Sequence, residues 1–273
     1  MRSCTPSKFS VPTRAAISHS CGRNKLRGGT TVKSEAVKYS VGGASRVGQL
    51  IYDEGKTGQP LLLVAPNWLS VCPQNIAIGQ RHASDGYVVF IPDMFGEGKG
   101  PKGTEQPMEF LAPFIEDVAG TRRAIVGAFD AMTAEAAKRG IGDGKRRAAI
   151  GYCYGGSNVL DLAREGADVA AVVSIHGVLA TPKPAKKGDV KAKVLVLHGA
   201  ADPVSPKAHR DMFEAEMDAA GARWMLLNFG GVVHAYTDPK ADFLPAAKYD
   251  EPATRYTNAM LDAFITDAFN GKL

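Results

Sequence analysis

The sequence predicts an α/β fold with a mostly parallel central sheet and helices on both faces. Short apolar runs of strand length recur along the chain, and helical patterns lie between them. No internal repeat or long linker interrupts this alternation after about residue 35. Strands that alternate with helices form βαβ units, in which the strands run parallel and are buried on both faces. We therefore expect a single domain over residues 35–273.

The first half of this domain shows both kinds of periodicity. Continuous apolar runs predict strands that are buried on both faces, and apolar side chains at intervals of three and four predict helices. In chain order, the predicted elements are a strand over 46–54, a strand over 61–66, a weak helix over 74–86, a strand over 87–93, a glycine-rich loop over 95–107 and a long helix over about 108–138.

The second half of the domain shows the same alternation of strands and helices, with clearer signals for where a helix ends. A glycine directly after a helical pattern is typical of a helix C-terminus. The predicted elements are a strand over 146–151, a helix over 155–165, strands over 170–177 and 192–199, a helix over 206–221 that closes at Gly221, a strand over 223–230 and an amphipathic helix over 251–270.

The composition is that of a globular protein that can bury a large core. The chain has 273 residues, of which 45% are hydrophobic and 22% charged. Its longest apolar runs are far shorter than the roughly 20 residues that span a bilayer, so we expect no membrane segment.

The positive charge of the chain is concentrated at its N-terminus. Residues 1–34 hold seven Lys and Arg residues and no acidic residue, and the rest holds 26 basic and 28 acidic residues. The predicted domain therefore offers no electrostatic reason to bind nucleic acid. We interpret 1–34 as a disordered tail or an over-extended start, with an organelle-targeting leader or a basic arm on nucleic acid as less favoured alternatives.

The four cysteines do not form a recognisable pattern. Cys4, Cys21, Cys72 and Cys153 include no Cys-x-x-Cys and no regular spacing, which argues against a disulfide framework and a zinc site. A reducing compartment, most simply the cytoplasm, fits them best. We expect no metal and no cofactor.

The segment "GYCYG" places Cys153 between Gly151 and Gly155, after a predicted strand and before a predicted helix. Gly-x-nucleophile-x-Gly in that context predicts a nucleophile elbow, a tight turn in which flanking side chains do not fit. The helix N-terminus would also favour the thiolate form. From these five residues alone, a small side chain that only fills a tight turn is an equally good interpretation.

Two further residues favour the interpretation of Cys153 as a nucleophile. Asp202 follows the predicted strand over 192–199, and His234 follows the strand over 223–230. Ligands of parallel sheets bind beyond the carboxyl ends of the strands, where all three residues are expected. The order nucleophile, acid, histidine is that of one class of hydrolases. We predict that His234 moves the thiol proton and that Asp202 orients His234.

The predicted oxyanion donors are two backbone N–H groups. The N–H of Tyr154 directly follows the cysteine, and a second N–H near Trp68 follows the strand over 61–66. Asn67, Tyr152 and Tyr236 are expected to line the substrate pocket.

At this point the chain resembles the dienelactone hydrolase family, a cysteine-using branch of the α/β-hydrolases. The resemblance covers roughly residues 38–270. It is carried by the motifs "GYCYGG", "LHGAADPVSP" and "VVHAYTDP", with support from "GYVVFIPDMFGEGKGP" and "YDEPATRYTNAM". It implies an α/β-hydrolase fold, hydrolysis of small esters or lactones without a metal, and the triad Cys153, Asp202 and His234.

Two positions depart from the family pattern. Where well-known members have a glutamate that helps to ionise the cysteine, this chain has Asn67. Where they have an arginine four residues past the histidine that grips a substrate carboxylate, it has Asp238. With these departures, a neutral ester or lactone is at least as good a prediction for the substrate as a carboxylated dienelactone. They also support the alternative of a hydrolase-fold binding or regulatory module with little turnover.

Other candidate residues have simpler interpretations. "GEGKG" at 96–100 lacks the Gly-Lys-Ser/Thr of a phosphate loop and is expected to be a surface loop. His176 and His198 are expected to pack at strand ends, Cys72 to be a small filler, and Arg81 to be a helix-surface charge or structural ion pair. Neither the physiological substrate nor the oligomeric state, monomer or dimer, follows from the sequence.

Overall fold

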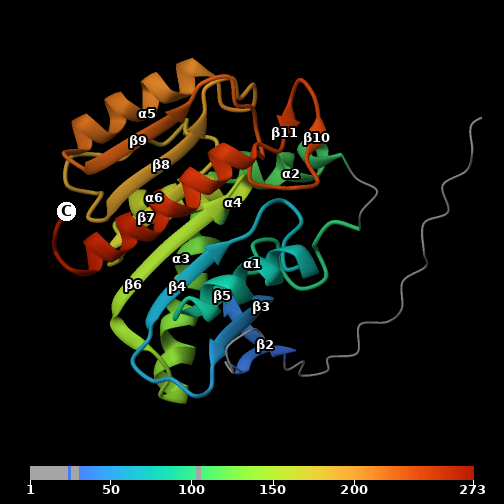
Figure 1. Ribbon diagram of the computed structural model, residues 1–273, viewed down its shortest axis with the longest axis vertical. Coiled ribbons are helices and arrows are strands. Elements are labelled where there is room, and N and C mark those ends of the chain that lie inside the picture. Colours follow the sequence, from blue (N-terminus) through green and yellow to red (C-terminus); the bar gives the residue numbers. More distant parts are fainter. Residues whose placement is uncertain (1–23, 26–30, 103–105) are drawn as a thin grey trace, which may run out of the picture.

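The main feature of the fold is a single twisted sheet (Figure 1). The computed structural model describes residues 24–25, 31–102 and 106–273, and within them nine strands lie in the order β1-β2-β3-β5-β4-β6-β7-β8-β9. These strands are β1 (Asn24–Lys25), β2 (Thr31–Val41), β3 (Ala44–Asp53), β4 (Pro60–Ala65), β5 (Val88–Ile91), β6 (Asp143–Tyr152), β7 (Ala171–Ile175), β8 (Lys193–Gly199) and β9 (Arg223–Phe229).

The sheet is mostly parallel, as the sequence predicts. Strands β5, β4, β6, β7, β8 and β9 run in one direction, and only the pairings of β2 with β1 and of β3 with β2 and β5 are antiparallel. Residues of β4, β5 and β7 are almost entirely buried, because helices cover both faces of the sheet. The carboxyl ends of the parallel strands consequently meet along one edge.

Helices form a layer on each face of the sheet (Figure 1). Helices α1 and α6 pack with one apolar cluster, whereas α2, α3, α4 and α5 pack with the other. No helix in the described part of the chain is long and apolar enough to cross a membrane. The helices are α1 (Pro73–Ser84), α2 (Pro107–Glu116), α3 (Val118–Arg139), α4 (Tyr154–Arg164), α5 (Lys207–Ala220) and α6 (Glu251–Phe269).

The single long helix predicted over 108–138 is wrong in one respect, because the structure divides it into α2 and α3 at Asp117. The backbone of Asp117 leaves the helical region, with φ −84° and ψ 67°. Its carboxylate accepts a hydrogen bond from the N–H of Gly120 at 2.8 Å, which caps α3. Apolar side chains keep their helical spacing across Asp117. The sequence pattern therefore does not show that a second helix, α3, begins there.

The sheet begins earlier in the chain than predicted. Strand β2 starts at Thr31, inside the segment 1–34 that we interpreted as a tail, and β1 pairs with it. The rest of that segment, with Cys4 and Cys21, lies outside the described residues. A small hairpin of β10 (Asp242–Phe243) and β11 (Ala247–Lys248) follows β9 and was also not predicted.

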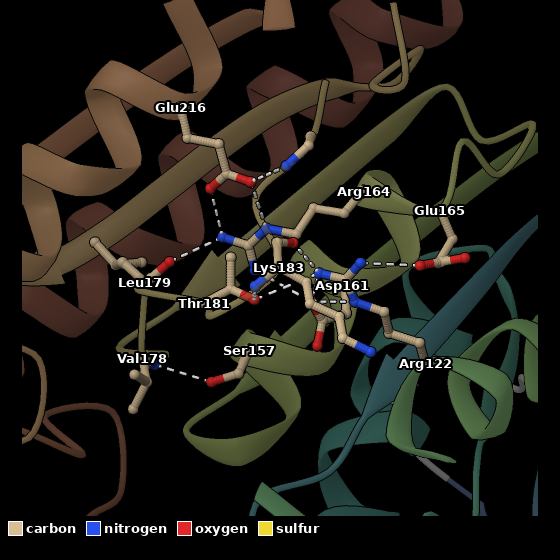
Figure 2. A network of polar contacts seen from close by, with 11 residues as sticks. Arg122, Ser157, Asp161, Arg164, Glu165, Val178, Leu179, Thr181, Lys183 and Glu216 are labelled. Carbon is tan, nitrogen blue, oxygen red and sulfur yellow. Dashed lines mark hydrogen bonds and ion pairs between the residues drawn. The ribbon is translucent and has the colours of Figure 1, made fainter. Parts of the chain in front are cut away.

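A buried polar network fastens the loop after β7 to the helices (Figure 2). Arg164 of α4 forms a two-pronged ion pair with Glu216 of α5, at 2.9 and 2.8 Å, and donates to the carbonyl of Leu179. Arg122 of α3 pairs with Asp161 and donates to the carbonyl of Lys183. The network thereby holds the loop that follows the carboxyl end of β7.

Candidate active site

Cys153 occupies a sharp turn between β6 and α4. Its φ of 55° and ψ of −118° are unusual for a residue other than glycine. The turn fits only because Gly151 and Gly155, two positions before and after the cysteine, have no side chains. A Cβ on Gly151 would lie 2.0 Å from the carbonyl oxygen of Gly155, and one on Gly155 would lie 2.1 Å from that of Ala65. This is the geometry of the predicted elbow.

The three residues of the predicted triad lie together in one chain of contacts. His234 Nε2 lies 3.1 Å from Cys153 Sγ, and His234 Nδ1 lies 2.7 Å from Asp202 Oδ2. Asp202 is 2% exposed and His234 7% exposed, whereas Cys153 is partly exposed. The other oxygen of Asp202 accepts the N–H of Val204 at 2.8 Å. The carboxylate is therefore held in place beside the imidazole.

The charge state of His234 depends on its two neighbours. Burial lowers its pKa, but the charge of the Cys153 thiolate and the hydrogen bonds to Asp202 and Cys153 raise it to about 10. With that pKa, the imidazole carries a proton at neutral pH.

Replacing Cys153 with serine removes the thiolate charge that raises the pKa of His234. We expect the pKa of this imidazole, measured by NMR titration, to fall clearly below its native value in Cys153→Ser. His82 of α1, whose pKa is lowered by burial and by the charge of Arg81, serves as the internal control. An unchanged pKa of His234 in the variant would show that the thiolate does not set it.

The backbone N–H groups of Tyr154 and Trp68 remain candidates for an oxyanion hole. Tyr154 is the first residue of α4, so its N–H has no partner within the helix. The loop that carries Trp68 is fixed by Asn75, which donates to Asn67 Oδ1 at 2.9 Å and to the carbonyl of Ser70 at 2.7 Å. Asn75 was not predicted, because nothing in the local sequence shows that α1 folds back onto this loop.

The residues predicted to line the substrate pocket differ in exposure. Tyr236 has no exposed surface, and its hydroxyl group forms a hydrogen bond with that of Thr257 at 2.8 Å, so its place in the pocket stays a prediction. Tyr152 is buried as well, and burial raises its pKa to about 12. Asn67 is partly exposed, but its side-chain oxygen also accepts the N–H of Leu69. It organises its own loop.

An aromatic cluster includes Tyr154, the residue that follows the candidate nucleophile. The ring of Phe95 lies 4.9 Å from Phe110 and 4.6 Å from Phe114, both on α2, and stacks on Tyr154 at 5.6 Å. Trp68 lies 6.4 Å from Phe110, and both Trp68 and Cys153 pack against the apolar core that contains Phe95 and Tyr154. One side of Cys153 therefore faces the apolar core.

His176 is more closely linked to the site than we expected. Its Nδ1 accepts the backbone N–H of Cys153 at 3.1 Å, and its ring lies 5.3 Å from that of His234. The interpretation of His176 as simple strand-end packing is therefore incomplete. For His198 that interpretation holds, because His198 is fully buried and contacts the carbonyl of Ser205 at 2.9 Å.

The remaining candidates lie in structural or surface positions. Arg81 is exposed and donates to Asn258 of α6 at 3.1 Å, as expected for a surface contact. Cys72 precedes α1 and its side chain caps nothing. The backbone of 96–100 forms a turn that Asp93 holds through the N–H of Gly96. Asp238 is partly exposed and accepts the N–H of Lys240.

The mostly parallel sheet, the sharp turn after β6, the acid after β8 and the histidine after β9 define an α/β-hydrolase. The chain belongs to the dienelactone hydrolase family, whose model matches residues 49–267. It is accordingly a hydrolase of the class that acts on carboxylic esters and lactones.

Individual relatives agree with this assignment. The solved structure m3DLH is 28% identical, with a TM-score of 0.80 over 87% of this chain and 98% of its own. The dienelactone hydrolase-like promiscuous phosphotriesterase P91 from metagenomic libraries is also 28% identical, with a TM-score of 0.77 and the same coverage. A Yersinia pestis protein named as a candidate carboxymethylenebutenolidase is 27% identical over 75% of this chain and 77% of its own.

Proposed function

We propose that the protein hydrolyses small, neutral carboxylic esters or lactones through a Cys153–His234–Asp202 triad. The observation that carries the proposal is the unbroken line of contacts from Sγ to Nε2, at 3.1 Å, and from Nδ1 to Asp202, at 2.7 Å. Nucleophile, base and orienting acid each lie within hydrogen-bonding distance of the next. The family assignment supports the same reaction class.

In the first half of the reaction, the Cys153 thiolate attacks the carbonyl carbon of the ester. The carbonyl oxygen takes the negative charge and accepts hydrogen bonds from the backbone N–H groups of Tyr154 and Trp68. When the tetrahedral intermediate collapses, the bond to the alkoxide oxygen breaks and His234 gives its proton to that oxygen. The alcohol leaves, or stays attached to the acyl group if the substrate is a lactone, and a thioester on Cys153 remains.

In the second half, water replaces the alcohol. Neutral His234 removes a proton from the water, whose oxygen attacks the thioester carbonyl. Collapse of the second intermediate breaks the bond between sulfur and carbon and releases the acid. The proton stays on His234, which restores the thiolate and imidazolium pair. Asp202 keeps the imidazole in the orientation that serves both steps.

Two features of the site support a neutral, apolar substrate. The aromatic side chains of Trp68, Phe95 and Phe110 favour an apolar acyl or ring group by burying it. Past the histidine, Asp238 stands where the family's substrate-binding arginine is expected. A carboxylate on the substrate would gain no ion pair at that position.

A substrate panel tests the proposal. It consists of p-nitrophenyl esters of graded acyl length, neutral lactones and one carboxylated dienelactone, each offered to the full chain. We expect hydrolysis of the neutral compounds, with kcat/KM rising as the acyl group fills the apolar side, and a poorer rate for the carboxylated compound. Flat progress curves for every ester and lactone, with the protein folded by circular dichroism, would instead favour a binding or regulatory module.

A further inference from the structure

The backbone of the nucleophile is held by two acceptors at once. The N–H of Cys153 donates to the carbonyl of Ile175 at 3.0 Å and to Nδ1 of His176 at 3.1 Å. Because the φ of 55° at Cys153 costs energy, surrounding contacts must hold the residue in that conformation. One of those contacts is a side chain, and a side chain can be changed by mutation.

The two nitrogens of His176 have different partners, which fixes the tautomer. Since Nδ1 accepts the N–H of Cys153, the proton of the neutral ring is on Nε2. That Nε2–H donates to Oγ1 of Thr237 at 2.8 Å. Thr237 lies three residues past His234 on the same loop. His176 thus forms a bridge from the backbone of the nucleophile to the loop of the histidine.

The ring of His176 also packs against two other rings. It lies 5.3 Å from His234 and 5.2 Å from Tyr236 in edge-to-face contacts, and it is 3% exposed. Burial, and next the charge of His234, lower the pKa of His176 well below its ordinary value. The ring therefore stays neutral beside the imidazolium and keeps Nδ1 free to accept.

We propose that His176 is a positioning residue that couples the Cys153 elbow to the His234 loop through its two nitrogens. It touches neither the substrate nor the reacting atoms, and it acts through the placement of Sγ relative to Nε2 of His234. The inference rests on the proposed function only in taking Cys153 as the nucleophile. It explains why a fully enclosed, neutral histidine stands at this strand end rather than an apolar residue.

The test uses three single variants of the full chain. His176→Phe keeps a ring but removes both nitrogens, and His176→Asn restores an acceptor near the place of Nδ1 and tolerates the φ of 41° found there. Thr237→Val removes only the acceptor of the Nε2–H. The readouts are kcat and KM for an accepted p-nitrophenyl ester, and the rate at which iodoacetamide alkylates Cys153.

Misplaced reacting groups cost rate even when the substrate still binds, so His176→Phe should lower kcat by about 10- to 100-fold with little change in KM. The alkylation rate should fall in the same variant. The His176→Asn variant should recover most of kcat and most of the alkylation rate. Thr237→Val should lower both rates less than His176→Phe does. Because both residues act in one chain of contacts, Thr237→Val should cost nothing more in the His176→Phe background.

Three outcomes would overturn the proposal. These are a native kcat and alkylation rate in His176→Phe, an Asn variant as impaired as the Phe variant, and additive losses in the double variant. A purely structural role would make the loss of each rate follow the loss of melting temperature across the Phe, Asn and Val variants. Alkylation of Cys153 needs no ester hydrolysis, so it still tests His176 if the native protein hydrolyses none of the panel.

Discussion

Replacing Cys153 with alanine is expected to lower kcat/KM for an accepted p-nitrophenyl ester by at least about 10⁴-fold, because the attacking atom is lost. Sγ of Cys153 lies 3.1 Å from His234 Nε2, within hydrogen-bonding distance. The remaining rate should come from substrate binding and the oxyanion donors alone. Steady-state kinetics of the purified variant measure the loss.

A serine variant and a second cysteine variant serve as controls. Cys153→Ser keeps the shape of the elbow and offers a weaker nucleophile, so it should stay folded and turn over far more slowly than the native protein. Cys72→Ala should keep the native kcat/KM, because Cys72 lies before α1 without a side-chain hydrogen bond to the helix. Turnover at the native rate in Cys153→Ala would rule out the proposed mechanism.

Replacing Arg164 with methionine should destabilise the fold by about 3–5 kcal/mol, because it leaves buried charges without their partner. The side chain of Arg164 is 2% exposed and that of Glu216 5% exposed. Figure 2 shows the contacts between them. Arg164 also bonds Asp161, whose pKa burial raises, although Arg164 and Arg122 act to lower it. Removing the guanidinium leaves the buried Glu216 without its charged partner and leaves Asp161 with Arg122 alone.

Urea unfolding measures the change in the free energy of unfolding, with the slope m as a check that the unfolded state is unaltered. The matched control is Lys207→Met, which breaks the exposed pair with Asp211 and should cost only about 0–1 kcal/mol. If Arg164→Met costs no more than Lys207→Met, the buried network does not hold the loop after β7. In that case the buried network does not stabilise the folded state.

The buried strands were predictable because their signal is local. Apolar runs such as that of β4 are buried on both faces, so their hydrophobicity alone marks them, and the observed bounds differ from the predicted ones by a few residues. Strand β2 was missed because it lies toward the edge of the sheet and alternates only weakly between buried and exposed residues. The turn to β3 does have a signal, since Gly42 and Gly43 both have positive φ, as a two-residue hairpin requires.

The order of the three candidate catalytic residues also follows from local motifs. Each of Cys153, Asp202 and His234 lies in the loop that follows a strand with an apolar run, and parallel strands bring their ends to one edge. That rule placed the residues near each other without any knowledge of distances. It could not show which side chains surround them, because those come from other segments.

What the sequence by itself determined, therefore, is the parallel sheet, the elbow and the edge at which the three residues gather. The tertiary structure alone decided that Asn67 turns its oxygen to Asn75, that Tyr236 lies beneath the site, and that His176 joins Cys153 to Thr237. The last two contacts span 23 and 61 residues of sequence. Periodicity reports only the environment of a single element, whereas such contacts depend on how distant loops meet once the sheet has formed.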